Sequence, residues 1–369
     1  MFEFLFTCVI SICHGYVFWR AASISFFQIP RPRRNLIIIA LALWLLFVGS
    51  FIFGRTVDTP WSRWLLMGGM TWMGTLFLLT CSLLAVEFVT IGGCFLPNLA
   101  KTLRSLAMAL ALLLAVIALH QGTTAPEVDR FEVTLPELPA KLDGEVVVVM
   151  SDLHIGTMLS EERLATIISE VREQHPQLIL LVGDIFEGFR EQPNPIAINL
   201  LRTMTAPMGV WGVPGNHEFY GRSLTIKALE QSGVKLLRNS WAEVSPGLIL
   251  AGVEEHTISR RPEEDTGLIT QALAGRPPGA TILLSHKPWG AEEAAAARVD
   301  LMLSGHTHGG QIWPFNYLVA RLFPLLEGRY MVNNMPVLVC RGTGTWGAPM
   351  RLWKPGEIMR ITLRSGQHA

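Results

Sequence analysis

The stretch Ser304-Gly305-His306-Thr307-His308-Gly309-Gly310 places two histidines one residue apart and between glycines. It follows the apolar run 299–303, which predicts a buried strand. At a strand end, residues i and i+2 can direct both imidazoles toward one small volume, and the glycines let the backbone approach it closely. A single His-x-His pair is a weak sign of a metal site. Its weight depends on whether other strands also end in metal-type ligands.

Four more predicted strands end in polar residues of this kind. The first is a β-branched run, typical of a strand that is buried on both faces. The runs and their following residues are 146–150 with Asp152 and His154, 178–182 with Asp184, 209–213 with Asn216 and His217, and 281–284 with His286. Helical patterns alternate with these strands, so we expect an α/β domain with its polar residues along one sheet edge. Further strand-like runs occur around 235–237, 242–244, 248–253, 337–340 and 358–363, and the more strand-rich later half predicts a second sheet packed against the first.

Helix signals separate the strands. Ser160 suits an N-cap position, with Glu161 and Glu162 favourably placed in the first turn. Apolar residues then recur at helical spacing as far as His175-Pro176, where we expect the helix to end. Further helices are predicted at 195–204 and 223–232. Residues 122–140, rich in Thr, Pro and Glu, predict a linker with one edge strand at 130–135.

The strand-end residues combine carboxylates, imidazoles and one carboxamide, without a thiolate. They are Asp152, His154, Asp184, Asn216, His217, His286, His306 and His308. Mixed nitrogen and oxygen ligands suit Mn, Fe or Zn. Because this set exceeds what one ion needs, it predicts a dinuclear centre, which can hold a bridging hydroxide and clamp a phosphoryl group. Taken singly, Asp152 fits a helix cap, Asn216 a turn and His286 a loop position, but coincidence explains all five motifs poorly.

In these motifs the sequence resembles the calcineurin-like metallophosphoesterases, whose motif order is D-x-H, G-D, G-N-H-D/E, H and G-H-x-H. The resemblance covers residues 145–310 and implies a four-layer sandwich of two packed mixed sheets flanked by helices. It implies two divalent ions, with manganese expected first and zinc or iron as alternatives. The implied ligands are Asp152, His154, Asp184 and His308 for one ion, and Asp184, Asn216, His286 and His306 for the other. His217 resembles the family's non-ligand histidine, which contacts phosphate or protonates the leaving oxygen.

One departure from the family pattern bears on the substrate. Members that hydrolyse phosphoprotein monoesters have an Asp-Arg pair soon after the G-D motif, and this chain has Glu187-Gly188 there. Glu187 can still orient His217, but the phosphate clamp is missing unless Arg341 or Arg351 replaces it. We therefore expect hydrolysis of phosphodiesters or pyrophosphates, with phosphomonoesters as the alternative.

The first third of the chain explains its unusual hydrophobicity. Half of all residues are hydrophobic, 16% are charged and the mean hydropathy is +0.36, which is too apolar for an ordinary soluble domain. Apolar stretches at 2–19, 36–53, 64–89 and 103–119 approach or exceed the roughly 17–25 residues that cross a bilayer. A buried core helix is the alternative for each stretch. A signal peptide fits the first one poorly, because Met1-Phe2-Glu3-Phe4 has no basic residue and Trp19-Arg20 is no cleavage site.

The sequence thus predicts an all-α transmembrane region of about four helices at 1–121, and a catalytic domain at 141–369 beyond the linker. The looser similarity of Gln311 and Arg341-Gly342-Thr343-Gly344 to membrane-attached bacterial phosphodiesterase-like members, and to their animal relatives with transmembrane helices, agrees with this. Four of the five cysteines lie in or near the apolar stretches, which leaves Cys340 alone in the catalytic domain. No disulfide framework can form there.

Loop charges predict the orientation of this integral, multi-pass membrane protein. The basic residues between the first two stretches and between the last two are Arg20, Arg31, Arg33, Arg34, Lys101 and Arg104. They mark a cytoplasmic side. Residues 120–128 carry no Lys or Arg, so we expect the catalytic domain on the extracytoplasmic side. The net charge of +0 and pI of about 7.2 give no global field that would attract nucleic acid.

The partners expected are therefore the lipid bilayer and a phosphate ester. The segment 312–326 is apolar for a loop region and either packs on the second sheet or forms an interfacial lip. In the second case a lipid headgroup or lipid-linked pyrophosphate becomes the expected substrate. The alternatives to an anchored phosphoesterase are a non-catalytic metal-binding scaffold and a receptor or transporter with an appended enzyme. The retained ligand set disfavours the scaffold, and the scarcity of charge in the apolar stretches disfavours transport.

Overall fold

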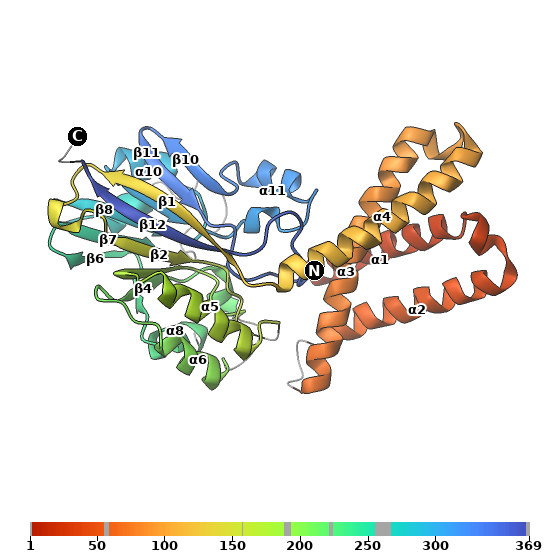
Figure 1. Cartoon of the computed structure of the whole chain (residues 1–369), viewed down its shortest axis with the longest axis horizontal. Helices are drawn as coiled ribbons and strands as arrows, with labels where there is room; N and C mark the ends of the chain where they lie inside the picture. The colour runs from red at the N-terminus through yellow and green to blue at the C-terminus, as the bar shows by residue number, and fades with distance from the viewer. Residues whose placement is uncertain are drawn as a thin grey trace. The chain divides into compact units, whose positions relative to one another are not determined.

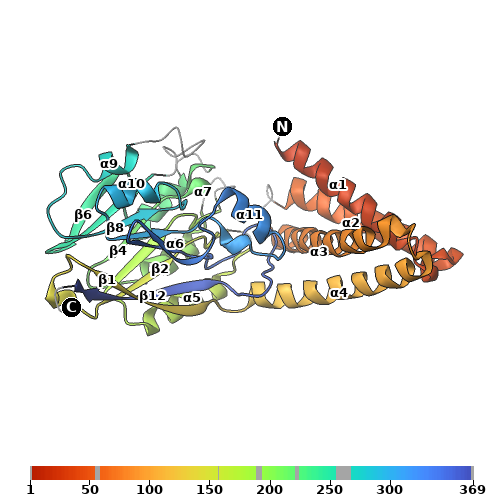
Figure 2. The same ribbon diagram turned by 90° about the horizontal axis from the view of Figure 1, so that it is seen from above.

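A computed structural model describes residues 2–54, 59–156, 158–187, 193–220, 224–254 and 267–366. The chain divides into two compact units. The helical unit comprises Met1–Thr123 and Gly347–Trp353, and the sheet unit comprises Thr124–Trp346 and Lys354–Ala369. The four apolar helices lie in the first unit and both sheets lie in the second (Figures 1 and 2).

The helical unit contains the four predicted apolar stretches as continuous helices. These are α1 (Phe2–Ala21), α2 (Pro30–Phe53), α3 (Pro60–Thr90) and α4 (Pro97–Thr123), joined in part by the short turns η1 (Ser25–Gln28) and η2 (Ile91–Gly93). Each of the four is long and apolar enough to cross a membrane. All five cysteines are free.

Charged residues in the helical unit form one compact network. The Glu87 carboxylate accepts from Arg104 Nε at 2.7 Å, and Arg20 Nη2 lies 2.9 Å from its other oxygen. Arg104 also donates to the Ser23 hydroxyl and to the Gly92 carbonyl oxygen. An acidic side chain in an apolar helix is costly unless it is paired. The two arginines therefore make Glu87 tolerable on α3.

The segment 347–353 joins the helical unit although it lies far along the chain. Its Arg351 amide donates to the Ala118 carbonyl oxygen at 2.8 Å, and the Trp353 amide donates to Gln121 Oε1 at 2.8 Å. Gly122 packs so closely on this segment that a Cβ atom there would lie 2.5 Å from the Pro349 carbonyl oxygen. The sequence pattern gave no sign of this association.

Two six-stranded mixed sheets form the sheet unit. The first has the order β1 (Glu127–Leu135), β12 (Glu357–Ser365), β2 (Val146–Met150), β3 (Leu178–Val182), β4 (Val210–Val213) and β5 (Lys235–Leu236). The second has the order β10 (Gly328–Val332), β11 (Met335–Val339), β9 (Leu301–Ser304), β8 (Ala280–Ser285), β7 (Leu248–Val253) and β6 (Ser240–Ser245). The central strands β2–β5 and β7–β9 run parallel, so their carboxyl ends share one edge in each sheet.

Helices cover the outer face of each sheet, which gives the predicted four layers (Figure 1). The first sheet packs on α5 (Glu161–Glu173), α6 (Pro195–Arg202) and α8 (Leu224–Gln231), and the second on α9 (Leu268–Ala272) and α10 (Ala291–Ala296). The residues of strand β2 are all apolar because both faces of the strand are covered. Val147 and Val149 enter the core between the sheets, whereas Val148 and Met150 face the helices.

Local signals placed most of these elements correctly. Ser160 caps α5 by accepting from the Arg163 amide, and the helix ends before His175-Pro176. Residues 122–140 contain the end of α4, the strand β1 and the turn η3 (Ala140–Leu142). Strand β1 lies at the sheet edge as predicted and pairs along its whole length with β12. The predicted helix 223–232 appears as α8, although residue 223 lies outside the described residues.

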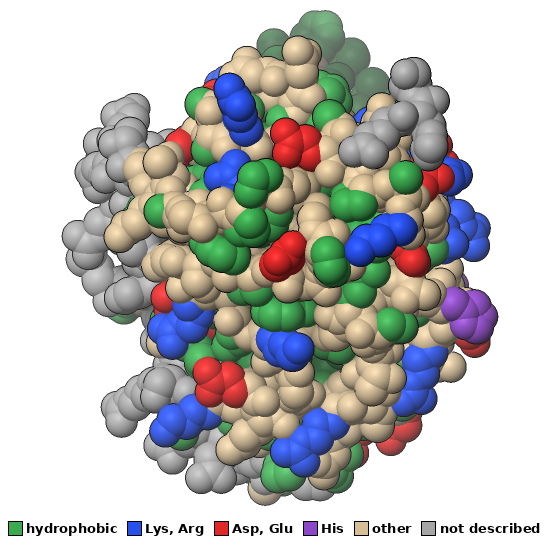
Figure 3. All heavy atoms as spheres, turned by 90° about the vertical axis from the view of Figure 1, so that its left-hand side faces the viewer, with side chains coloured by type: hydrophobic (Ala, Val, Ile, Leu, Met, Phe, Trp, Pro, Cys, Tyr) green, Lys and Arg blue, Asp and Glu red, His purple; other side chains and the backbone are tan. Residues whose placement is uncertain are grey.

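The surface of the sheet unit carries charges of both signs. On the face shown in Figure 3, basic and acidic side chains alternate between small hydrophobic areas, and neither sign forms a continuous field. This face offers no basic track of the kind that follows a phosphate backbone. It agrees with the neutral composition.

Candidate metal centre

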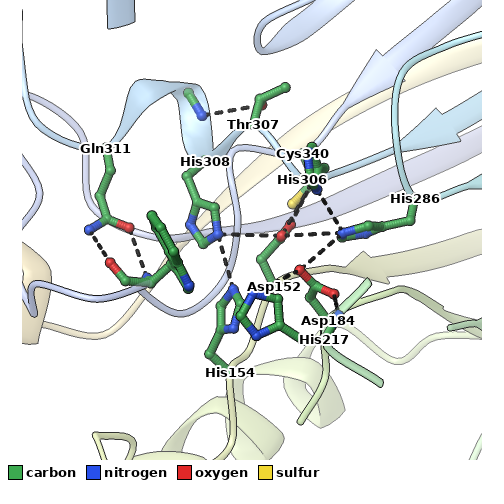
Figure 4. A network of polar contacts seen from close by, with 12 residues as sticks. Asp152, His154, Asp184, His217, His286, His306, Thr307, His308, Gln311 and Cys340 are labelled. Carbon is green, nitrogen blue, oxygen red and sulfur yellow. Dashed lines mark hydrogen bonds and ion pairs between the residues drawn. The ribbon is translucent and has the colours of Figure 1, made fainter. Parts of the chain in front are cut away.

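The strand-end residues predicted from the sequence converge at one place between the two sheets (Figure 4). Loops from the first sheet are tied together because the Asp152 amide donates to the Gly183 carbonyl oxygen and the His154 amide to the Asp184 carbonyl oxygen. The loops after β8 and β9 are joined by the Gly305 amide, which donates to the His286 carbonyl oxygen at 2.8 Å. Main-chain bonds therefore hold the loops in place before any side chain contributes.

Five of the predicted ligands have left-handed backbone conformations. Their φ angles are +54° at Asp152, +49° at His154, +53° at Asp184, +71° at His306 and +52° at His308. This region is unfavourable for residues with a Cβ atom, at about 1–2 kcal/mol each. Such strain persists where surrounding structure enforces it, and it clusters at functional sites.

Asp152, His154 and His308 form one potential ion site. Their ligand atoms lie within 4.8 Å of one another, and all three side chains are buried. The Nε2 atoms of His154 and His308 face each other at 3.1 Å, and His308 Nε2 lies 3.4 Å from Asp152 Oδ1. The Asp152 carboxylate also accepts from the His306 amide at 3.0 Å, which fixes its orientation.

Asp184, His286 and His306 form a second potential ion site beside the first. The Asp184 carboxylate lies 3.1 Å from His286 Nε2, and that nitrogen lies 3.2 Å from His306 Nδ1. His286 Nδ1 donates to the Val182 carbonyl oxygen at 2.8 Å. Because a carbonyl oxygen only accepts, this bond assigns the proton to Nδ1 and leaves Nε2 as the ligand atom.

His217 and Glu187 lie at the junction of the two groups. His217 Nδ1 donates to the Glu187 main-chain oxygen at 3.0 Å, and its Nε2 lies 4.0 Å from Asp184 Oδ2. The Glu187 carboxylate lies 2.8 Å from His154 Nδ1 and 3.7 Å from His217 Nδ1. Glu187 therefore orients two histidines, one through its side chain and the other through its backbone. The sequence predicted only His217 as a partner of Glu187.

Glu218 has a structural role at the centre that sequence reasoning missed. Its buried carboxylate accepts from the main-chain amides of Asp184 at 2.9 Å, Phe186 at 2.9 Å and Gly215 at 2.7 Å. It thereby joins the loops after β3 and β4. Gly215 lies so close to Asp184 that an added Cβ would be 2.3 Å from Oδ1. Asn216 follows Gly215 directly in the sequence and begins α7 (Asn216–Tyr220).

The protonation preferences of these groups follow from burial and from their neighbours. Burial favours a raised pKa at both aspartates. At Asp152 this effect is the larger one, and the pKa is raised. At Asp184 the neighbouring His286 and His217 outweigh burial and hold the pKa well below its usual range. Burial lowers the pKa of His306 well below its usual range. Burial also lowers the pKa of His154, but Glu187 outweighs this and raises it to about 9. Cation binding must therefore displace a proton from His154.

These residues fit a pair of divalent cations. The donor set is oxygen and imidazole nitrogen, the ligand atoms are already gathered, and partners at Nδ1 of His154 and His286 direct Nε2 toward the centre. When bound, two such ions would supply Lewis acidity and lower the pKa of a water molecule. Asp152, His154 and His308 would hold one ion, and Asp184, His286 and His306 the other.

Comparisons with known proteins agree with this geometry. The model of the calcineurin-like phosphoesterase family matches residues 146–310. A metallophosphoesterase of Bacillus subtilis, YkuE, is 31% identical over 62% of this chain and 82% of its own length. The chain belongs to the calcineurin-like phosphoesterase family. A metallophosphoesterase of Campylobacter jejuni, Cj0846, is 30% identical over 70% of this chain and 68% of its own length.

A family member with membrane helices is also similar. The Danio rerio protein named "Transmembrane protein with metallophosphoesterase domain" is 32% identical over 277 residues, or 70% of this chain. The match covers 62% of that relative's length. With the four apolar helices, this similarity identifies a membrane protein of the family, and the fold implies a dinuclear divalent metal site.

Arg341, which the sequence offers as a substitute for the family's phosphate clamp, is engaged by acidic side chains. The Arg341 guanidinium contacts the carboxylates of Asp129 and Glu357 and donates to the Pro355 carbonyl oxygen at 3.0 Å. Its side chain is buried among these acceptors, so it stabilises the junction of β1 and β12. Arg351 belongs to the segment that packs in the helical unit.

Aromatic residues lie beside the histidines of the centre. The Phe323 ring packs edge-on against His306 at a centroid distance of 5.0 Å and stacks on Trp289 at 5.2 Å. Trp346 lies 6.4 Å from the His217 ring. Gln311 holds Trp346 by accepting from its amide and donating to its carbonyl oxygen, both at 2.9 Å.

Proposed function

We propose that the protein is a membrane-anchored, two-metal phosphoesterase that hydrolyses phosphodiester or pyrophosphate bonds. The observation that carries the proposal is the convergence of two ligand triads that meet at Asp184 and His217. A scaffold that only bound a metal would have no need of two adjacent triads with a further oriented histidine. We propose Asn216 as an additional ligand at the Asp184 triad. Manganese is the ion we expect first, with zinc or iron as alternatives.

His217 is the proposed proton donor. Its Nδ1 proton is held by the Glu187 carbonyl oxygen, so Nε2 faces the centre and can carry a second proton to a leaving oxygen. The His217 amide donates to Asp184 Oδ1 at 2.8 Å, which holds the proposed donor beside this ligand. Glu187 acts as a positioning residue for His217 and His154.

The surroundings of the centre favour a diester or pyrophosphate over a monoester. A monoester dianion benefits from an additional guanidinium grip. Arg341 is engaged by Asp129, Glu357 and Pro355, so it contributes no such grip in this arrangement. The aromatic residues Trp346 and Phe323 instead provide an apolar edge beside the histidines. A lipid-linked phosphate ester would use that edge for the apolar part of its leaving or retained group.

The test is hydrolysis of an aryl phosphodiester by the full chain in detergent with Mn²⁺, beside an aryl monoester. We expect diester turnover that Asp184→Asn abolishes, because the variant loses the carboxylate that lies between the triads. Asp143→Asn is the matched control, since Asp143 is a carboxylate of the same unit whose partners are Arg364 and the Ser365 amide. Faster monoester turnover would transfer the assignment to a phosphomonoesterase. Metal binding without turnover on either substrate would favour the scaffold.

We also propose that the sheet unit lies on the extracytoplasmic side, because basic residues gather at the end of α1, at the start of α2 and at the start of α4. A membrane-impermeant thiol reagent tests this on Ile196→Cys, since Ile196 is 53% exposed on α6. Labelling in intact cells is expected. Labelling only after lysis would place the unit in the cytoplasm.

A further inference from the structure

Several large apolar side chains are exposed on the segment that follows the His306-Thr307-His308 turn. It includes the short helix α11 (Asn316–Leu322), which lies outside both sheets (Figures 1 and 2). The exposed fractions are 40% at Trp313, 43% at Phe315, 65% at Tyr317, 61% at Leu318 and 71% at Leu322. We call these five residues the α11 surface. Large apolar side chains gathered in this way mark an interaction surface.

Helix α11 has little support from the protein itself. Among its seven residues, all of which are described, none is buried. In contrast, α5 buries Leu164, Ile167, Ile168 and Val171 against the first sheet. A helix of two turns is marginal in water and depends on packing for its stability. The apolar side chains of α11 are therefore not covered in the way that those of α5 are.

The composition of the segment identifies the chemistry of its partner. Residues 312–326 contain no Asp or Glu and a single basic residue, Arg321, which is exposed in the last turn of α11. Tryptophan, tyrosine and arginine beside leucine and phenylalanine are the combination that favours the boundary between lipid headgroups and acyl chains. A soluble protein partner would require no such bias against acidic residues.

The unit that carries this surface is also bonded covalently to helices that can cross a bilayer. The sheet unit begins at Thr124, one residue after α4 ends at Thr123. Trp346, which Gln311 holds, is followed directly by Gly347–Trp353, and that segment packs in the helical unit. The sheet unit is thus bonded to the helical unit at three points in the chain, and one of them is the end of α4. Each link is a single peptide bond.

We propose that the α11 surface inserts into the headgroup region of the lipid bilayer and thereby sets the metal centre at the membrane surface. Contacts with the ligand turn carry this effect to the centre. The Thr307 hydroxyl donates to the Leu326 carbonyl oxygen at 2.5 Å, Phe323 packs on His306, and a Cβ at Gly310 would overlap Asn316 at 2.2 Å. Movement of α11 therefore moves the turn that contains His306 and His308.

Insertion depth is measured by spin labelling of the full chain in vesicles of phosphatidylcholine and phosphatidylglycerol. The nitroxide is attached to Leu318→Cys after replacement of Cys8, Cys13, Cys81 and Cys94 by serine, while the buried Cys340 stays. Ile196→Cys on α6 is the matched control, since this residue is also an exposed aliphatic side chain on a short helix. We expect oxygen to relax the label at 318 more than a water-soluble nickel complex does, with the reverse at 196.

Two results would overturn the proposal. Equal access of the nickel complex to both labels would show that the α11 surface lies in water. Shielding of the 318 label from both agents, with spin–spin broadening between labelled chains, would assign the surface to a second copy. Neither result depends on turnover, so the proposed hydrolytic function stands or fails separately.

A paired activity measurement tests the consequence for lipid substrates and rests on the proposed function. The variant carrying Leu318→Asp and Leu322→Asp is expected to lose about tenfold or more of its turnover of a phosphodiester embedded in vesicles, because charged side chains disfavour insertion. Its turnover of a soluble aryl phosphodiester should stay unchanged, as should both rates in Ile196→Asp. Equal loss on both substrates would indicate damage to the centre and would contradict a role in membrane docking.

Discussion

The substitution Gly215→Ala tests how tightly the ligand loops are packed around Asp184. A Cβ at residue 215 would lie 2.3 Å from Asp184 Oδ1, 2.6 Å from the Asp184 amide nitrogen and 2.8 Å from His286 Cδ2. Ordinary contact begins at 3.4 Å, so the nearest pair must separate by about 1.1 Å. The neighbours cannot yield easily, because Glu218 binds the amides of both Gly215 and Asp184.

A displacement of this size is large for a metal site. Ligand distances are held to within about 0.2 Å, and misplacement of a catalytic group by about 1 Å costs on the order of 100-fold in rate. We expect Gly215→Ala to lose at least one of two bound ions and about 100-fold of its phosphodiesterase rate. Bound metal is measured by mass spectrometry after dialysis, and the rate with an aryl phosphodiester and Mn²⁺.

Gly366→Ala is the matched control for a general packing defect. A Cβ there would lie 2.8 Å from Pro136 Cα, at the β1–β12 edge of the first sheet. It should lower the thermal midpoint while the metal content and rate persist. If Gly215→Ala kept two ions and a rate within threefold of the wild type, the ligand loops would be looser than the contacts imply. The role given to Asp184 would then be refuted.

Three further outcomes are expected. Glu187→Ala should lower the hydrolysis rate by about 10–100-fold, because it removes the carboxylate beside His154 Nδ1; Glu187→Gln should restore part of that rate, and a full rate in both variants would exclude a positioning role. Burial raises the pKa of Glu357 to about 7 despite Arg341, so this carboxyl stabilises the fold below pH 4.5 and that stability is lost as pH rises through 7. The stability lost is about 3 kcal/mol. Thermal midpoints at pH 5 and pH 8 measure it, and this loss should vanish in Glu357→Gln. If the variant showed the same difference between the two midpoints as the wild type, the pH effect would belong to another group. Removal of divalent ions with a chelator should lower the thermal midpoint of the sheet unit and Mn²⁺ should restore it, whereas an unchanged midpoint would contradict metal binding by the folded site.

The metal ligands could be placed from the sequence because two regularities act together. Runs such as 146–150 and 178–182 have no polar residue, so each must be a strand covered on both faces, and parallel strands bring their carboxyl ends to one edge. The polar residue that follows each run must then lie at that edge of the sheet. This reasoning located Asp152, Asp184 and His286 without any knowledge of side-chain contacts.

Other features were beyond sequence reasoning because they depend on partners distant in the chain. Arg341 follows a strand, as the ligands do, yet its guanidinium turns to Asp129 and Glu357, which arrive from both ends of the sheet unit. The carboxylate of Glu218 is directed to three main-chain amides, and no periodicity reveals such a target. The association of 347–353 with α4 likewise involves individual hydrogen bonds, such as those to the Ala118 carbonyl oxygen and to Gln121 Oε1. Pattern reasoning detects faces and periods, and it does not detect individual acceptors.

The strained backbone at the ligands explains why the centre needs two sheets. Five non-glycine residues with positive φ cost about 5–10 kcal/mol together, which is comparable with the whole stability of a typical domain. A single sheet edge with mobile loops would relax these residues into ordinary conformations. Here the loops of the first sheet are bound by Glu218, and those of the second by the Gly305 amide and the Asp152 carboxylate. The strain can persist because neighbouring loops of each sheet bind one another and the Asp152 carboxylate joins the two sets through the His306 amide, and an ion that binds all of these ligands offsets part of its cost.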